Sequence, residues 1–329
     1  MGVKALRKIQ LGQETTAGTA VAASTIWRGE GLLTDAREIV AVAEDLGELV
    51  PRNRAYESHK LATVKLDDTP ATFEQLPYIL ACGVESVVTG EADGNGGGKI
   101  YQFDTPITAT QTPKTLTIEG GDNVRVDEVE YAFVSDFSLS GAQKEAVMMA
   151  ATFTGRQATD AEFTADQTPP DVEEILFGAG KIYIDPTTIG ATQKTLTWLG
   201  FKLDYKTGHQ PLFSGDGETY FAGMVDAAPE ITGELTLLHN ANGETEITAA
   251  RAQTTRLVRM IFEGSAVTSG TTYTKKTLII NAAIAYTAVP DVGEADGNTI
   301  ITLPFRVVYH TTAAVGCQFI VVNALESLT

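Results

Sequence analysis

Apolar and polar residues alternate with a period of two along many stretches of this chain. Residues 128–133 read Glu-Val-Glu-Tyr-Ala-Phe, which places valine, tyrosine and phenylalanine on one face of an extended backbone and both glutamates on the other. Residues 231–237 alternate isoleucine and leucine with threonine and glutamate in a similar way. This alternation is typical of antiparallel strands that bury one face. The pattern therefore predicts a mainly β fold.

Helical spacing of apolar residues is found in two segments. The first begins near Thr69, which can cap a helix before Pro70, and continues to Leu80 with a kink or restart at Pro77. The second covers residues 245–262, whose apolar positions recur every three or four residues. We expect the opposite face of this second helix to be solvated or to lie in an interface, and it carries Arg251, Arg256 and Arg259.

A segment rich in proline and carboxylates divides the chain nearly in half. It contains Pro169 and Pro170, has few large apolar residues and predicts a linker. On either side the order of elements is the same, with strands, one helix, a loop rich in glycine or threonine, and closing strands. This order predicts a duplicated domain, with an N-terminal arm (1–31), a first domain (32–157), a linker (158–175) and a second domain (176–329).

The charge of the chain disfavours tight binding of duplex DNA. The 329 residues contain 42 acidic and 24 basic side chains, a net charge of −18, whereas DNA binding requires clustered Lys and Arg that replace condensed counterions. We therefore expect that DNA, where it meets this protein, is repelled and passes by without being bound. No apolar run approaches the roughly 18 residues that span a bilayer, so no contact with a membrane is expected. The N-terminal residues show neither an export signal nor an acylation motif.

The residue types that carry chemistry do not form a recognisable motif. Cys82 and Cys317 lie far apart, outside any zinc or disulfide spacing, and are expected to be buried free thiols. The glycine-rich residues 94–100 lack the positions that a phosphate-binding loop requires. We expect no enzyme activity, no cofactor, and no catalytic or metal site. The histidines are isolated from nucleophile and metal motifs, and they are His59, His209, His239 and His310.

Two parts of the sequence resemble a known family. Residues 7–20, which read Arg-Lys-Ile-Gln-Leu-Gly-Gln-Glu-Thr-Thr-Ala-Gly-Thr-Ala, resemble the opening arm of the major tail proteins, the tail tube proteins of long-tailed bacteriophages. Residues 180–185 (Gly-Lys-Ile-Tyr-Ile-Asp), residues 208–213 (Gly-His-Gln-Pro-Leu-Phe) and the following Asp216-Gly217 resemble a later portion of the same family. Together these similarities extend over most of the chain.

The resemblance implies a structural role. It implies small β-sandwich or barrel domains, each with a flanking α-helix, whose long hairpins join those of neighbouring subunits in a continuous barrel around a lumen. A duplicated chain would form trimeric rings with pseudo-sixfold symmetry, stacked into a hollow conduit for DNA ejection. The implied partners are other copies of the chain and further tail proteins, namely the tape measure, tail terminator and baseplate. The implied location is the virion tail, assembled in the cytoplasm of the bacterial host.

The strand predicted over residues 127–140 supplies candidates for the lumen wall. Its polar face is expected to line the lumen, with ordinary exposure on the outer surface as the alternative. Three segments are expected to extend toward neighbouring subunits: the N-terminal arm to Gly31, residues 90–99 and residues 267–274. The candidate lumen-facing residues are Glu128, Glu130, Asp136, Ser138 and Ser140.

The sequence leaves two other classes of protein open. A ligand-binding β-sandwich, such as a carbohydrate-binding module, is compatible with the acidic composition rich in threonine and glycine. It would need an exposed aromatic platform, for which only Trp27 and Trp198 are available among tryptophans. A hydrolase on a β scaffold is disfavoured because no catalytic motif is present. Hollow polymers or rings under the electron microscope would distinguish the tail tube from both alternatives.

Overall fold

The computed structural model describes residues 1–94, 97–110, 112–268 and 270–328. Strands account for 49% of the chain and helices for 8%, which confirms the mainly β prediction. Within the described residues the strands are antiparallel, and the fold is consistent with a β-sandwich. The helices are the 3₁₀ turns η1 (Lys4–Leu6) and η2 (Phe177–Ala179) and the α-helices α1 (Leu76–Gly83) and α2 (Ala241–Arg251).

A small sheet holds the N-terminal segment against the body. Its strands run in the order β2, β1, β9, β10 and β12, all antiparallel. The N-terminal residues are therefore part of a sheet from the first strand onward. The bounds are β1 (Lys8–Gln13), β2 (Thr25–Ile26), β9 (Leu116–Gly121), β10 (Val126–Ala142) and β12 (Ala158–Ala161).

A larger sheet runs through both halves of the chain. It continues from β3 through β6, β11, β10, β14 and β17 to β21, with β20 paired to β21 at one end. Because β10 pairs with β14, strands from the two predicted domains share one ladder. The bounds are β3 (Gly31–Asp35), β6 (Ala62–Pro70), β11 (Met148–Gly155), β14 (Trp198–Lys206), β17 (Glu230–Leu238), β20 (Val292–Ala295) and β21 (Asn298–Val307).

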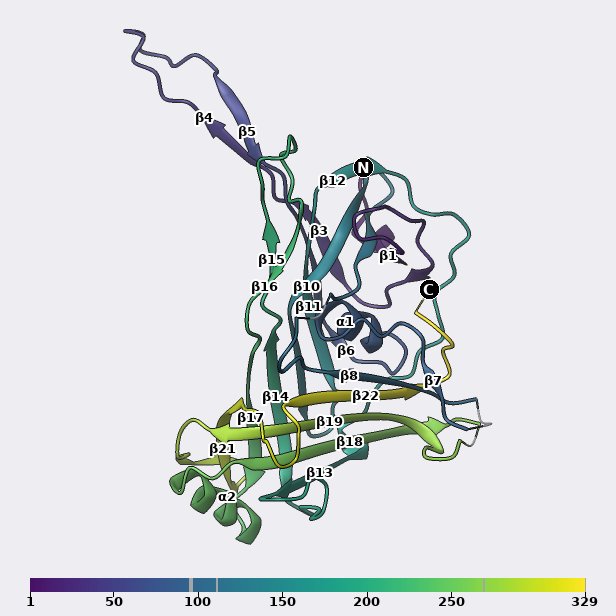
Figure 1. Ribbon diagram of the computed structural model, residues 1–329, viewed down its shortest axis with the longest axis vertical. Helices are drawn as coiled ribbons and strands as arrows, with labels where there is room; N and C mark the ends of the chain where they lie inside the picture. The colour runs from purple at the N-terminus through teal and green to yellow at the C-terminus, as the bar shows by residue number, and fades with distance from the viewer. Residues whose placement is uncertain (95–96, 111, 269, 329) are drawn as a thin grey trace.

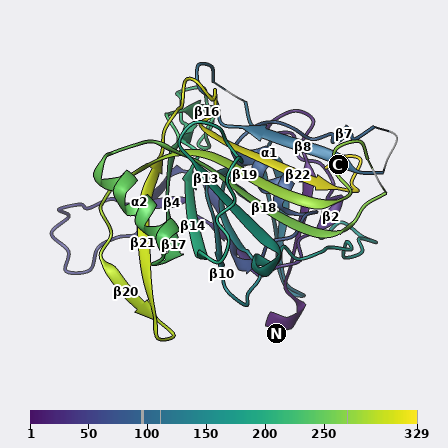
Figure 2. The ribbon, with the colours of Figure 1, turned by 90° about the horizontal axis from the view of Figure 1, so that it is seen from below.

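A second layer of strands crosses the long strands at one end of the molecule (Figure 1). It runs from β13 through β18, β19, β22 and β8 to β7, and β19 also pairs with β21. Figure 2 shows β18, β19 and β22 side by side, with α2 toward one side. The bounds are β7 (Glu91–Ala92), β8 (Lys99–Asp104), β13 (Gly180–Asp185), β18 (Arg256–Ala266), β19 (Lys275–Tyr286) and β22 (Cys317–Asn323).

Aromatic side chains fill the space between the two sets of strands. Phe137 of β10 stacks on Tyr205 of β14 with ring centroids 4.8 Å apart, and both rings contact Phe319 of β22. All three side chains are buried. Burial of one such ring contributes about 1.5–3 kcal/mol, so this contact ties the long strands to the crossing layer.

The helix near Thr69 begins later than predicted. Strand β6 continues through Pro70, and α1 begins at Leu76 with Pro77 in its first turn. The Thr72 hydroxyl accepts a hydrogen bond from the Gln75 amide, which turns the chain between the strand and the helix. All eight residues of α1 are buried. The expected start near Thr69 is wrong because pairing with β11 extends the strand. The helix has a single start at Leu76, with Pro77 in its first turn, instead of a kink or restart within a longer helix.

The second helix is shorter than predicted and starts earlier. Asn240 caps it by accepting hydrogen bonds from the amides of Asn242 and Gly243, and it ends at Arg251. From Arg256 onward the chain forms β18, which is paired on both sides, with β13 and β19. The apolar spacing of this segment fits either element, and two neighbouring strands decide for the sheet.

The segment predicted as a linker lies against the body. Its first four residues form β12, which pairs with β10. Farther along, Thr164 donates hydrogen bonds from its amide and hydroxyl to buried Glu119, and Glu174 forms a bridge with Thr72. Within the described residues each half contributes one α-helix. The division into two similar domains stays a prediction.

Candidate assembly surface

One hairpin projects far beyond the rest of the molecule (Figure 1). It is formed by β4 (Glu38–Ala41) and β5 (Ala55–His59), and the Val42 amide extends the ladder to the Arg54 carbonyl at 2.9 Å. Residues 42–54, here called the arm tip, continue beyond both strands. Because the arm tip packs against no other element, it exposes apolar side chains to solvent, namely Leu46, Leu49 and Val50.

Ion pairs hold the two sides of the arm tip together. Arg52 donates two hydrogen bonds to Glu48, at 2.6 and 3.0 Å, and Arg54 donates one to Glu44 at 2.6 Å. Because these pairs are exposed to solvent, their charges are screened by water and salt. Gly47 turns the chain between them with φ of 68°, a left-handed conformation that favours glycine. The arm tip is thus a defined turn with charged sides and an apolar end.

A second hairpin supports the base of the arm. It is formed by β15 (His209–Leu212) and β16 (Gly223–Asp226), and His209 Nδ1 lies 2.7 Å from an Asp226 carboxylate oxygen. The Lys60 amide donates a hydrogen bond to the Thr219 carbonyl, and the rings of His59 and Phe213 meet edge to face at 5.4 Å. The arm therefore emerges from a two-hairpin base.

Arg156 joins this base to the N-terminal segment. Its guanidinium lies 4.9 Å from the ring centroids of both Tyr131 and Tyr220. It also donates hydrogen bonds to the Phe221 carbonyl and the Gly18 carbonyl, at 3.2 and 3.3 Å. Cation–π contacts contribute about 0.5–2 kcal/mol each, more when desolvated. One side chain thus fixes β10, the second hairpin and the N-terminal segment relative to one another.

The N-terminal segment expected to extend outward is folded onto the body. Strand β1 pairs with β9 over six residues, and the side chain of Glu14 is buried just after it. The Glu14 carboxylate accepts hydrogen bonds from the hydroxyls of Thr115 and Thr117 and from the amides of Gly18 and Tyr131. The segment is therefore part of the folded subunit.

The other two segments expected to extend outward contact each other. Loop 90–99, of which residues 95–96 lie outside the described residues, carries the buried Asp93. Its carboxylate accepts hydrogen bonds from the amides of Thr271, Thr272 and Tyr273 in loop 267–274, whose residue 269 also lies outside the described residues. Burial alone would raise the pKa of Asp93, but these hydrogen bonds hold it below the usual value. The two loops thus form one unit.

The candidate lumen-facing residues fall in two different sheets. Glu128 and Glu130 belong to the first part of β10, in the small sheet, whereas Asp136, Ser138 and Ser140 belong to the larger sheet. Between the two groups β10 bends, with a left-handed Tyr131 (φ 54°) and a bulge between Val134 and Asp136. The single polar face expected along the strand is therefore divided in two.

Within the small sheet, the two glutamates have different surroundings. Glu128 lies directly opposite Glu119 in the β9–β10 ladder, and burial together with Glu119, Glu130 and Glu14 raises the pKa of Glu128. Glu130 instead lies 3.4 Å from the Arg156 guanidinium. These carboxylates form part of the subunit's internal packing.

On the larger sheet, the polar face carries both signs of charge. Asp136 lies opposite Lys206 of β14, which forms an ion pair with Glu230 of β17 at 2.8 Å. In the next rows Ser138 lies opposite Asp204, and Ser140 lies opposite Lys202. The lysines and carboxylates balance one another along these rows. This face is polar without being a dense acidic wall.

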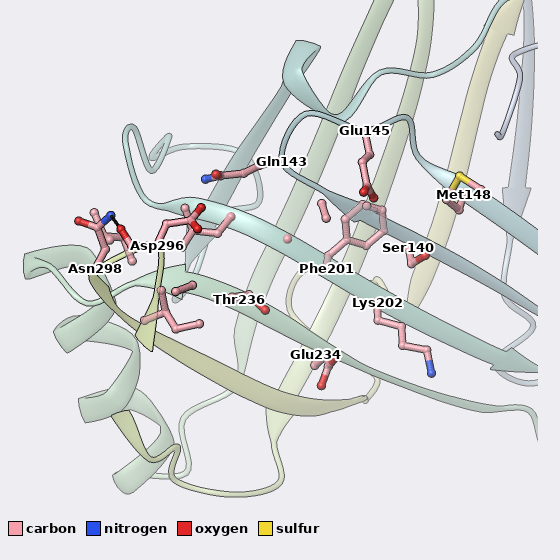
Figure 3. Close-up of a pocket in the computed structure, with 17 residues that line it drawn as sticks. Ser140, Gln143, Glu145, Met148, Phe201, Lys202, Glu234, Thr236, Asp296 and Asn298 are labelled. Atoms are coloured by element: carbon pink, nitrogen blue, oxygen red, sulfur yellow. Dashed lines mark hydrogen bonds between the residues drawn. The ribbon is translucent and has the colours of Figure 1, made fainter. Parts of the chain in front are cut away.

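A cavity of about 510 Å³ lies at the end of this face (Figure 3). Ser140 contributes to its lining, together with Glu145, Lys202 and Glu234 around Phe201 (Figure 3). The lining includes no histidine or cysteine among the residues that the structure describes.

Elsewhere the titratable groups are dispersed. Across the described ranges, no group of three or more His, Cys, Asp and Glu residues is arranged to hold a metal ion. Cys82 and Cys317 are buried free thiols, as predicted, and burial raises the pKa of Cys317 to about 12. No helix in the described part of the chain is both long and apolar enough to cross a bilayer. The histidines occupy four separate places, with Glu38 beside His59, Asp226 beside His209, Glu244 beside His239 and the Ala313 amide beside His310.

The two tryptophans do not form an exposed aromatic platform. Trp27 is buried, and half-buried Trp198 packs among Phe177, Phe201 and Phe262 with centroid distances of 4.6–5.7 Å.

Comparison with known proteins does not assign the chain to a family. No protein-family model matches the chain, and no curated protein matches it significantly.

Neither projecting hairpin is predicted from the sequence. The arm falls within the predicted first domain, although Gly47 and Pro51 lie among charged residues between two short alternating runs. That combination is a signal for a long hairpin turn. The length of the projection is a tertiary property, because it depends on where the remaining strands end.

Proposed function

We propose that the chain is a structural subunit of a bacteriophage tail tube. It polymerises as stacked rings, three chains to a ring with pseudo-sixfold symmetry, around a hollow conduit for DNA ejection. The observation that carries this proposal is the β4–β5 hairpin, which leaves a mainly β body and presents Leu49 and Val50 to solvent. A projecting apolar hairpin is costly in an isolated subunit and useful in one that is covered by a neighbour.

The polar face of β10, β14 and β17 is the proposed lumen wall. Its candidate residues are Asp136, Ser138 and Ser140, while Glu128 and Glu130 lie beyond the bend in β10. Its lysines are matched by carboxylates, as in the pair of Lys206 with Glu230. Such a face offers little unpaired positive charge to replace the counterions of DNA, so a polyanion slides past it. Partners in the tail are the tape measure, tail terminator and baseplate.

Electron microscopy of the purified full-length chain tests the proposal. The protein is concentrated over a salt series and imaged in negative stain. Hollow tubes or rings of uniform diameter are expected. A chain that stays monomeric under all of these conditions, by imaging and by sedimentation velocity, contradicts the proposed role.

A further inference from the structure

The arm tip exposes three apolar side chains to solvent. Leu49 is 104% exposed and Val50 is 77% exposed, relative to reference values for the free residue, and Leu46 is about half exposed. The three residues lie within five positions of one another in the arm tip. A group of exposed apolar side chains marks an interaction site more often than an isolated exposed leucine does.

A cavity at the other end of the molecule is lined by six apolar side chains together with lysine, glutamine and threonine side chains. Its volume is about 670 Å³, and it lies between β13, the segment leading into β14, and the β10–β11 turn. We call it the lower cavity. Leu196, which also lines it, is 91% exposed and has a left-handed backbone (φ 53°). The apolar lining comprises Phe177, Ile182, Leu196, Trp198, Leu199 and Leu238.

The charges of the arm tip and the lower cavity are complementary. Lys144, Lys181 and Lys194 line the cavity. Lys181 is paired with Glu263 at 2.8 Å, so the uncompensated positive charge comes from Lys144 and Lys194, which form no ion pair among the described residues. The arm tip carries three carboxylates against two arginines, hence a net charge of −1. Glu44 and Glu48 are paired with Arg54 and Arg52, so the unbalanced negative charge is that of Asp45. Opposite potentials at two surfaces favour their encounter and orient it.

The two features lie at opposite ends of the long axis (Figure 1). The arm tip is at one extreme of the molecule, and β13, which borders the lower cavity, is near the other. One copy therefore cannot fill its own cavity with its own arm. A contact between two different surfaces of identical chains is heterologous, and it generates rings or open-ended polymers.

From these observations we propose that the arm tip of one copy inserts into the lower cavity of a second copy. Leu49 and Val50 pack against the wall around Trp198, while Asp45 approaches Lys194. This inference rests on the proposed function and gives the residues of the contact along the tube axis. It assigns a partner to the cavity, namely a second copy of the chain.

Cysteine trapping tests the contact directly. Cys82 and Cys317 are buried, so cysteines introduced at exposed positions are the reactive ones under native conditions. The doubly substituted full-length chain L49C/L196C is oxidised and separated without reductant. A ladder of dimers, trimers and longer species is expected. A mixture of L49C with L196C is expected to stop at the dimer that joins the two variants.

A matched control places the second cysteine elsewhere on the surface. The variant L49C/V124C uses the exposed Val124 of the β9–β10 turn, which does not line the cavity. It is expected to give at least tenfold less crosslinked product than L49C/L196C. Equal crosslinking of the two variants overturns the proposal. So does dimerisation of L49C alone, because that result pairs one arm with another.

Electron microscopy of the unmodified chain separates this inference from the proposed function. If tubes form but L49C/L196C gives no ladder, the arm does not enter the lower cavity and the inference is wrong, although the tube role stands. If the ladder forms without tubes or rings, the contact is real and the proposed tube role is wrong. If neither forms, both proposals are wrong.

Discussion

Arg256 of β18 and Glu246 of α2 form a buried, bidentate ion pair. The Arg256 guanidinium donates hydrogen bonds of 2.8 and 2.7 Å to the two carboxylate oxygens, and the Tyr286 hydroxyl donates another at 3.0 Å. Both charged side chains are almost fully buried. This pair fastens the helix to the sheet, and it explains why Arg256 does not lie on the solvated or interface face expected for it.

Removing one partner of this pair should destabilise the protein strongly. In Glu246→Gln the Arg256 charge stays buried without its counterion, so we expect a loss of about 3–5 kcal/mol in the free energy of unfolding. The double variant E246L/R256M removes both charges and should lose much less. Denaturant unfolding measures each value, and Arg251→Ala, on the exposed end of α2, is the control. A double variant as unstable as the single one contradicts this account.

Replacing Glu128 should stabilise the subunit at neutral pH. Its pKa in the folded state is raised by burial and by neighbouring carboxylates, so the folded state binds its proton more tightly than the unfolded state does. The resulting penalty is absent below the unfolded pKa of about 4.3 and grows as the pH rises through the folded pKa. Glu128→Gln should therefore raise the melting temperature at pH 7.

The pH dependence of this effect provides its control. Like charges directly opposite each other in a ladder cost about 0.2–1 kcal/mol, which sets the size of the gain. The difference between Glu128→Gln and the unmodified chain should shrink toward zero near pH 4. A gain that is the same at pH 4 and pH 7 would point to a cause other than ionisation.

Glu14 should prove essential for holding the N-terminal segment. Glu14→Ala leaves four buried or half-buried donors without their acceptor, including the hydroxyls of Thr115 and Thr117. We expect a loss of about 3 kcal/mol, since hydrogen bonds to charged groups contribute about 1.5–3 kcal/mol each and are not additive. Limited proteolysis should then cleave near Gly18. Glu30→Ala, which removes an exposed pair with Lys4, should change neither measurement.

Lysines on the proposed lumen wall should slow DNA ejection. Replacing Asp136, Ser138 and Ser140 with lysine adds four positive charges to one face and gives DNA phosphates a place to bind. Particles assembled from this variant should eject DNA more slowly, most clearly at low salt, where screening is weakest. Substituting Glu130 is avoided because its contact with Arg156 is structural.

A charge-matched control places the same four charges on α2. Glu244→Lys, Thr245→Lys and Thr248→Lys change exposed residues of the helix. This variant should eject DNA at the unmodified rate. If both variants eject at that rate across the salt series, the β10 face does not line the lumen.

The sequence predicted the elements whose pattern is local. Period-two alternation predicts β10 and β17, and Pro77 lies in the first turn of α1, within the segment predicted to be helical. It failed where two neighbours competed for one segment. Residues 256–262 have helical spacing, but β13 and β19 supply hydrogen-bond partners on both sides, and these outweigh local propensity.

The arrangement of the candidate surface residues cannot be predicted from the sequence. The polar residues of β10 were identified individually, but the bend at Tyr131 and the bulge before Asp136 that divide them follow from contacts with β9 and β11. A bulge shifts the alternation by one residue, so a single face cannot be extrapolated through it. Loops 90–99 and 267–274 are far apart in the sequence, and their contact through Asp93 and three amides of the second loop is set by the tertiary structure.

The sequence by itself determined that this chain is a mainly β protein with buried thiols and a strong acidic excess, because alternation and composition are properties of the chain. Only the tertiary structure decided which hairpin projects, which charges are buried in pairs, and which cavity lies opposite the arm tip. The position of the arm depends on contacts between distant segments, such as that of Lys60 with Thr219, and the burial of Arg256 with Glu246 depends on how α2 packs against β18. Their relative placement is set by strand pairing and core packing, which no local pattern encodes.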